Sequence, residues 1–148
     1  MTAPLDEQPM RHALREAEQA FKQDEVPIGA VVAWKGQVIA RAHNLTERLN
    51  DVTAHAEMQV ITAAAERIGG KYLKDCTVYV TVEPCPMCAG ALAWAQTGRI
   101  VFVAFDEKSG YRRIGGKLLH PKTQVTGGVL EPECADLMKA FFRKKRAL

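Results

Sequence analysis

Apolar residues near the start of the chain recur at the spacing of one helix face. They follow Pro9, which suits a first helical turn, and they are Met10, Leu14, Ala17 and Phe21. Residues 28–34 and 37–43 are then two runs rich in β-forming side chains. Only Lys35 and Gly36 separate these runs, which is the length of a tight turn, so the pattern predicts a hairpin.

The middle of the chain predicts a helix followed by a strand. Thr53 can cap a helix over 54–68, whose interior is mostly alanine and aliphatic residues. Gly69 and Gly70 then supply the positive-φ residue that often ends a helix. Residues 76–82 are a short apolar run typical of a strand.

The second half of the chain continues the alternation. A helix is expected to begin near Pro86 and to end near Gly98. The run 100–105 is continuously apolar, which predicts a strand covered on both faces, and a weaker strand pattern lies near 125–130. A last helix begins at Pro132 and is expected to bury one stripe: Cys134, Leu137, Met138 and Phe141.

Strands that alternate with helices favour one mixed sheet with helices on both faces. We therefore predict an α/β fold, a three-layer α/β/α sandwich around a five-stranded mixed sheet. The chain has 148 residues and no linker, which fits a single domain over 1–148. No apolar run approaches the roughly 18 residues that span a bilayer, so we expect a soluble cytoplasmic protein with no membrane partner.

Positive charge is unevenly distributed along the chain. Residues 108–122 and 139–148 hold half of the 20 Lys and Arg residues and no acid, whereas all 17 acidic residues lie elsewhere. Clustered positive charge fits a polyanionic partner docking on one face. A solvated, solubilising tail explains the same pattern equally well.

Two segments carry the candidate chemistry, and each lies where a helix is expected to begin. They are Thr-Ala-His-Ala-Glu at 53–57 and Glu-Pro-Cys-Pro-Met-Cys at 83–88. Cys85 and Cys88 are three residues apart and share a helix face, so both sulfurs can reach one ion. His55 supplies a third ligand of a type that zinc accepts, and three protein ligands leave a tetrahedral position open for water.

Glu57 is the candidate proton acceptor beside this open position. Two thiolates offset the charge of the ion, so bound water is acidified less and a nearby base becomes useful. Residues two apart do not share a helix face, which separates the role of Glu57 from that of His55. The helix N-terminus favours its ionised form.

The cysteines also admit other interpretations. The Cys85–Cys88 pair has the spacing of a redox pair, and pairing of the cysteines in disulfide bonds is a further interpretation. A closed structural zinc site would need Cys76 and Cys134, but both occupy positions expected in the core. Three histidines stand apart from these segments and are expected to be surface or hydrogen-bonded residues: His12, His43 and His120.

The combination of His-Ala-Glu at 55–57 with Pro-Cys-Pro-Met-Cys at 84–88 resembles the zinc-dependent nucleobase and cytidine deaminases. The likeness extends along nearly the whole chain, at 27–30, Asn44, 83–90, Glu133-Cys134 and 141–143. Within this superfamily the chain is most similar to bacterial tRNA-specific adenosine deaminases, which convert the wobble adenosine of an anticodon to inosine. The resemblance implies their α/β/α sandwich and their homodimer.

The resemblance also implies roles for individual residues. Three of them would bind one zinc ion (Zn²⁺) per subunit: His55, Cys85 and Cys88. Glu57 would move protons between water, N1 of adenine and the departing amine, while Asn44 and the backbone around Ala30 would hold the base or ribose.

A tRNA anticodon loop as partner requires contacts outside this pocket. The target base must be splayed out of its stack to react. Basic side chains are expected to grip the flanking phosphates: Lys108, Arg112, Arg113, Arg143, Lys144 and Arg146. Tyr111 and Phe142 are candidate exposed aromatic residues for stacking, although Phe142 fits a core position equally well.

One segment departs from the family pattern. Residues 106–110 and 118–121 match it, but Tyr-Arg-Arg-Ile-Gly-Gly at 111–116 replaces the usual small residues. This connection lies near the pocket mouth in relatives, so it bears on substrate choice. A deaminase of a free base or nucleoside such as guanine, cytosine or cytidine is the alternative function, and a non-catalytic RNA- or zinc-binding module is a third.

Overall fold

The computed structural model of this chain describes residues 4–115, 117–128, 132, 136, 139–141, 143 and 144. Some predictions fall outside these residues, namely those for Cys134, Leu137, Met138, Phe142 and Arg146. Within the described part of the chain, no helix combines the length and apolar character needed to cross a membrane.

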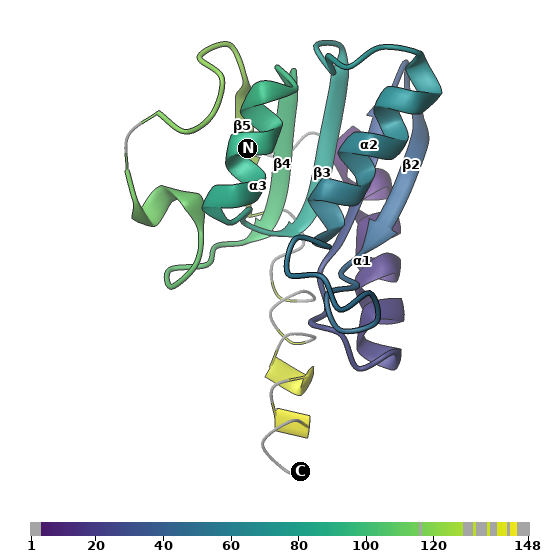
Figure 1. The fold of residues 1–148 in the computed structure, drawn as a ribbon, viewed down its shortest axis with the longest axis vertical. Coiled ribbons are helices and arrows are strands. Elements are labelled where there is room, and N and C mark those ends of the chain that lie inside the picture. The colour runs from purple at the N-terminus through teal and green to yellow at the C-terminus, as the bar shows by residue number, and fades with distance from the viewer. Residues whose placement is uncertain are drawn as a thin grey trace.

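A five-stranded mixed sheet forms the centre of the molecule, in the order β2-β1-β3-β4-β5 (Figure 1). β1 pairs antiparallel with both β2 and β3, whereas β3, β4 and β5 run parallel. The strands are β1 (Gly29–Trp34), β2 (Gln37–His43), β3 (Cys76–Val82), β4 (Arg99–Ala104) and β5 (Gln124–Gly127). The predicted fold class is confirmed.

Helices cover both faces of this sheet. They are α1 (Pro4–Lys22), α2 (Ala56–Ile68) and α3 (Pro86–Trp94), with a short 3₁₀ turn η1 (Tyr111–Arg113) in the connection after β4. Figure 1 shows α2 and α3 side by side in front of the sheet and α1 behind it. The layers arise because strand side chains alternate, so Ala30 and Val32 pack towards α2 while Val31 packs towards α1.

The hairpin and the central strands follow the sequence pattern closely. Strands 37–43 and 76–82 are confirmed at both ends, and the first and fourth strands shift by one residue. Lys35 and Gly36 have φ values of 52° and 76°, the left-handed pair that a two-residue hairpin turn needs. The continuously apolar run in β4 is buried on both faces as expected, from Ile100 to Val103.

Two helix starts differ from their predictions. α1 begins at Pro4, so Pro9 lies inside the helix rather than at its first turn. The sequence pattern did not show this earlier start, because the residues just before Pro9 are polar and extend no apolar stripe. Thr53 does not cap α2, since its N–H and hydroxyl donate instead to the Asp51 carboxylate at 2.8 and 2.7 Å. His55 is the N-cap residue, and its ring makes no capping hydrogen bond.

Two element ends also differ. α3 ends at Trp94 rather than near Gly98, because Gln96 adopts φ 53° and the Thr97 hydroxyl donates to the Leu92 carbonyl at 3.0 Å. Gly98 lies beyond the helix, where its backbone crosses closely over Lys74. The last strand begins at 124 and ends at 127, which is shorter than the predicted 125–130, two residues of which lie outside the described part.

Gly29 marks the closest approach of α1 to the sheet, and it supports a stability prediction. A Cβ atom there would collide with the Ala13 carbonyl and lie 2.6 Å from the Ala17 nitrogen. Gly29→Ala is therefore expected to destabilise the fold by about 1–3 kcal/mol or more, because helix and strand must separate. The matched control is Gly70→Ala, where an added Cβ meets nothing within 4 Å. Equal thermal unfolding midpoints for the two variants would contradict this packing argument.

Candidate active site

A cavity of about 1070 Å³ opens at the edge of the sheet where β3 ends and the helices α2 and α3 begin. Its lining includes His55, Glu57 and Cys85, together with residues of the connections on either side. Two helix N-termini meet there, and each carries partial positive charge from its aligned peptide dipoles. The local field therefore favours thiolate and carboxylate groups at this edge.

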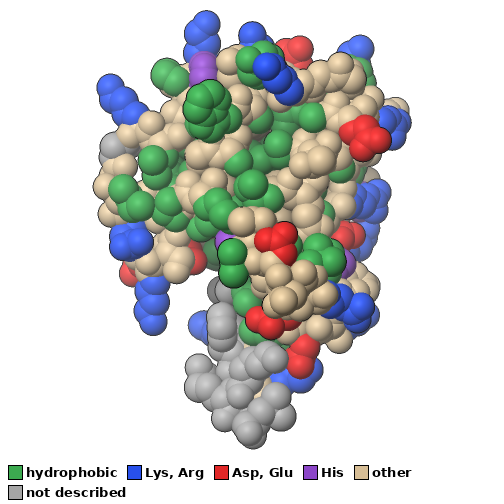
Figure 2. Space-filling view, viewed as in Figure 1, with side chains coloured by type: hydrophobic (Ala, Val, Ile, Leu, Met, Phe, Trp, Pro, Cys, Tyr) green, Lys and Arg blue, Asp and Glu red, His purple; other side chains and the backbone are tan. Residues whose placement is uncertain are grey.

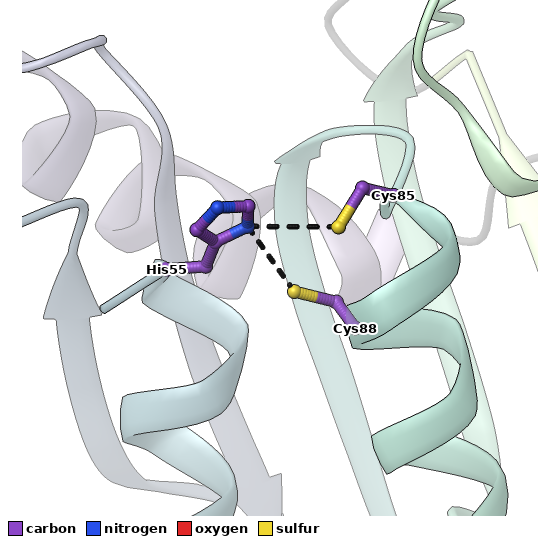
Figure 3. A group of neighbouring side chains, drawn as sticks. All are labelled: His55, Cys85 and Cys88. Atoms are coloured by element: carbon purple, nitrogen blue, oxygen red, sulfur yellow. Dashed lines mark hydrogen bonds between the residues drawn. The ribbon is translucent and has the colours of Figure 1, made fainter. Parts of the chain in front are cut away.

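Three side chains from these two helix starts converge on one point (Figure 3). The Nδ1 atom of His55 lies 3.6 Å from the Cys85 sulfur and 3.4 Å from the Cys88 sulfur. All three ligand atoms lie within 4.8 Å of one another. Cys85 is the N-cap residue of α3, and Cys88 follows it on the same face of the first turn. The structure thus brings together the predicted metal-ligand group.

This group fits a zinc ion. Zn–S bonds of about 2.3 Å and Zn–N bonds of about 2.0–2.1 Å at a tetrahedral angle place sulfur and nitrogen about 3.5–3.6 Å apart. The separations from His55 to Cys85 and Cys88 match that value without rearrangement. One imidazole and two thiolates are also ligands that zinc accepts.

Hydrogen bonds shift the pKa values of the two thiols in opposite directions. The pKa of Cys85 falls to about 4, chiefly because the Cys88 thiol and then the His55 ring donate to its sulfur. The pKa of Cys88 rises, first because it is the donor in that pair and then because it is buried. The hydrogen bond between the His55 ring and the Cys85 sulfur raises the pKa of His55. The Cys85 sulfur is therefore ionised at neutral pH, and a thiolate is the form of cysteine that binds a cation.

Glu57 reaches the same place from the first turn of α2. Its side chain is 3% exposed, and its Oε1 atom has no hydrogen-bond partner among the described residues. Burial is the main cause that raises its pKa to about 7. A buried carboxylate oxygen without a hydrogen-bond partner is costly for folding. Its presence indicates a functional role, in which a ligand or a reacting group binds to this oxygen.

Comparison with known proteins assigns the chain to a family. A family model for MafB19-like deaminases matches residues 5–146. The chain belongs to this deaminase family. The tRNA-specific adenosine deaminase of Bacillus subtilis (strain 168) is 46% identical over 146 residues, which is 95% of this chain and 91% of that protein. The corresponding protein of Agrobacterium fabrum is 46% identical over 142 residues, 93% of each chain.

Solved structures of other deaminases are similar to the structure of this deaminase. A structure from work on A-to-I editing by tRNA:A34 deaminases at the wobble position superposes with a TM-score of 0.82 and 43% identity, covering 88% of this chain and 98% of that one. A guanine deaminase of Bacillus subtilis superposes with a TM-score of 0.64 and 36% identity, covering 67% and 64%.

One wall of the deaminase cavity is the segment after β2. Asn44 is buried there and lines the cavity, and its contact with the base or ribose stays a prediction. Glu25 holds this segment, since its carboxylate accepts hydrogen bonds from the backbone of Glu47 at 3.0 Å and of Arg48 at 2.7 Å. The Asn44 amide also approaches Glu25, at 3.5 Å. The sequence did not mark Glu25 as a functional residue. Its signal is full burial of an acidic side chain, and burial is known only from the structure.

The expectation for Ala30 needs correction. Ala30 is fully buried within β1, where it pairs with Ala42 and Val80, and it does not line the cavity. Val26 and Ile28, just before the strand, line the cavity instead. The reason is that the chain passes the cavity before it enters the sheet.

The predicted basic residues divide into two groups. Lys108 and Arg143 line the cavity mouth, and so does Lys139 from the same C-terminal stretch. Others lie outside that lining: Arg112, Arg113 and Lys144. Lys144 approaches Asp24 at 3.7 Å, and nearby Phe141 is buried in edge contact with Phe21, so these two residues lie against the end of α1.

Tyr111 does not behave as an exposed stacking residue. It is half-buried and packs against the core between the sheet and α2, and its burial raises the pKa of its hydroxyl. Its backbone N–H donates to the Pro84 carbonyl at 2.8 Å. The prediction of an exposed aromatic residue is therefore wrong, because the connection after β4 folds back onto the end of β3.

Proposed function

We propose that this deaminase converts adenosine to inosine at the wobble position of a tRNA anticodon loop. The observation that carries the proposal is the buried Glu57 Oε1 atom, which has no hydrogen-bond partner among the described residues and lies in a cavity that also contains the His55 and Cys85 side chains. The identity of nearly half of all residues to tRNA-specific adenosine deaminases supports the choice of substrate. A tRNA substrate would also place the enzyme in the cytoplasm.

We assign one zinc ion per subunit to His55, Cys85 and Cys88. These residues would hold the ion by one imidazole and two thiolates, and a zinc ion bound there would leave a fourth ligand position for water and would make that water more acidic. The three residues come from the starts of two different helices, so both helices must be docked for the group to form. Binding and folding are then linked.

Glu57 is the proposed general base and acid. Its carboxylate takes a proton from the attacking water as the oxygen bonds to C6 of adenine, and it delivers a proton to N1 of the ring. It then takes the proton of the new C6 hydroxyl and passes it to the amine at C6, so the C6–N bond breaks, ammonia leaves and the C6 carbonyl forms. One water is consumed, and the ring keeps a C6 carbonyl as inosine.

The rest of the cavity would hold the splayed-out nucleotide. Asn44 offers an amide to the base or ribose from one wall, and Lys108 and Arg143 offer positive charge at the mouth. The target base must leave its stack before C6 can reach Glu57. Cations at the rim suit the phosphates on either side of that base.

We also propose that the enzyme works as a homodimer. The helix α3 is apolar on all sides, and its outer face exposes Met87 and Trp94, the latter 85% accessible. Figure 2 shows hydrophobic side chains gathered on the face formed by α2 and α3. Large exposed apolar side chains of this kind are typical of protein interfaces. Sedimentation of the full-length protein tests this directly, and a monomer at micromolar concentration would contradict it.

A substrate panel tests the proposed reaction. The zinc-loaded protein is incubated with tRNA bearing a wobble adenosine, with the bare anticodon stem-loop, and with adenosine, cytidine, cytosine and guanine. Ammonia release and inosine formation are expected with the tRNA and the stem-loop. Turnover of guanine or a cytosine compound alone would support a free-base or nucleoside deaminase instead, and no turnover of any substrate would support a binding module.

The salt dependence of tRNA binding tests the cavity-mouth cations. Lys108→Gln and Arg143→Gln are each expected to weaken binding and to reduce the slope of log K against log salt by about 0.7–0.9, the value for one lost phosphate contact. Lys35→Gln is the control, because Lys35 lies in the hairpin turn at the opposite end of β1. Equal slopes for all three variants would exclude a phosphate role for the two cations.

A further inference from the structure

Glu83 is a buried carboxylate that the proposed reaction does not use. It follows the last residue of β3, and its side chain is 1% exposed where it pairs with Arg112. Its Oε1 atom accepts a hydrogen bond from the Asp106 N–H at 3.1 Å, and its Oε2 atom accepts one from the Arg112 N–H at 2.9 Å. One carboxylate therefore joins both ends of the segment 106–112, which we call the rim segment.

Further contacts make this junction close-fitting. The Arg112 guanidinium lies 3.3 Å from the Glu83 carboxylate and 4.1 Å above the Phe105 ring. A Cβ atom at Gly110 would collide with the Glu83 carboxyl group, so only glycine allows this approach. The Gly110 N–H also donates to the Asp106 carbonyl at 2.8 Å, which closes the rim segment on itself.

The rim segment carries cavity-lining residues between its two anchored ends. Lys108 and Ser109 line the cavity mouth, and their backbone N–H groups donate to the Asp106 side chain at 3.1 and 3.0 Å. Both side chains are exposed, so little packing holds them in place. Their position relative to the buried Glu57 thus depends on hydrogen bonds that end on Glu83.

We infer that Glu83 is a positioning residue that holds the rim segment where it can contact the nucleotides flanking the target base. This inference rests on the proposed function and names a determinant of its substrate preference. Glu83 transfers no proton in the proposed reaction. The metal-ligand group and Glu57 lie at the starts of α2 and α3 and not in the rim segment. Loss of Glu83 should therefore impair recognition of RNA more than it impairs chemistry.

Glu83→Gln is the principal variant, because it keeps the size of the side chain. A glutamine amide has one acceptor oxygen, so its NH₂ group must face one of the two backbone N–H groups and that hydrogen bond is lost. We expect KM for the anticodon stem-loop to rise about tenfold, as for a lost hydrogen bond to a charged group. We expect kcat, zinc content and turnover of adenosine, where measurable, to change much less.

Two further variants separate the causes. Glu18→Gln removes an exposed carboxylate on α1 and is the matched control, with no expected change. Arg112→Gln removes the ion pair but keeps the backbone N–H that donates to Glu83. Its effect on KM is expected to be smaller than that of Glu83→Gln. An equal effect would overturn the assignment of the anchoring to the two backbone hydrogen bonds.

Hydrogen–deuterium exchange supplies a readout that needs no substrate. The backbone N–H groups of Asp106 and Arg112 should exchange faster in Glu83→Gln, whereas those of β3 should not. Unchanged exchange, or an equal loss of activity on all substrates together with zinc, would overturn the inference. Faster exchange in a protein whose wild type never deaminates the stem-loop would instead overturn the proposed function and leave the anchoring role intact.

Discussion

Replacing Glu57 with glutamine is expected to lower kcat for adenosine deamination by roughly 10²–10⁴-fold, the usual contribution of a general acid–base group. Glutamine has nearly the same shape but cannot take up or deliver a proton. Zinc content should stay at that of the wild type, because Glu57 lies outside the His55, Cys85 and Cys88 group. Inosine formation and metal analysis of the same preparation measure the two quantities.

The stability of this variant is informative as well. Because the Glu57 Oε1 atom is buried without a partner among the described residues, its carboxylate opposes folding, and Glu57→Gln should melt no lower than the wild type. Glu66→Gln, an exposed carboxylate on the same helix, is the control. Activity within tenfold of the wild type would remove Glu57 from the reaction, and loss of zinc would make it a ligand instead.

Removal of the metal should have the second large effect. Chelation of the zinc-loaded protein is expected to abolish deamination and to lower Tm by at least about 5 °C, which corresponds to about 2 kcal/mol for a domain of this size. The physical reason is that an ion held by this group would join the starts of α2 and α3, and its removal would leave the groups at these starts without a common partner. Calorimetry with and without chelator, followed by re-addition of zinc, measures both effects.

Single substitutions refine that experiment. Cys88→Ser should reproduce the loss of zinc and activity, because a hydroxyl is a poor substitute for a thiolate ligand. Cys76→Ser is the control, since Cys76 is buried at the first residue of β3, at the other end of that strand from the ligand group, and lies outside this group. This variant is expected to lose some stability, because a hydroxyl replaces a thiol in the core, and to keep the zinc stoichiometry of the wild type. Identical melting curves with and without chelator would contradict a metal that links the two helices.

The sequence allowed the fold class to be predicted because each element carries its own periodic signal. The strands 37–43 and 76–82 were predicted to the residue, since alternating or continuously apolar runs end where turn residues begin. The group formed by His55, Cys85 and Cys88 was accessible for a related reason. Its members were marked by residue type, and the three-residue spacing of the two cysteines places both sulfurs on one face of a helix whatever the rest of the fold does.

Features that depend on distant contacts could not be predicted in this way. Ala30 lies two positions from Ile28, which lines the cavity, but pairing on both sides buries Ala30 in the sheet. Tyr111 lies in a basic, polar connection, yet that connection folds back and packs the ring against the core. In both cases the deciding neighbour is far away along the chain.

The sequence by itself determined the order of the elements, the residues that could bind a metal, and the carboxylate beside them. These follow from residue type and spacing over a few positions. Only the tertiary structure decided that Glu25 and Glu83 each hold a segment that lines the cavity, because each bonds to backbone groups more than twenty positions away. Backbone N–H groups have the same chemistry at every residue except proline, so no sequence pattern marks which of them a buried carboxylate will meet.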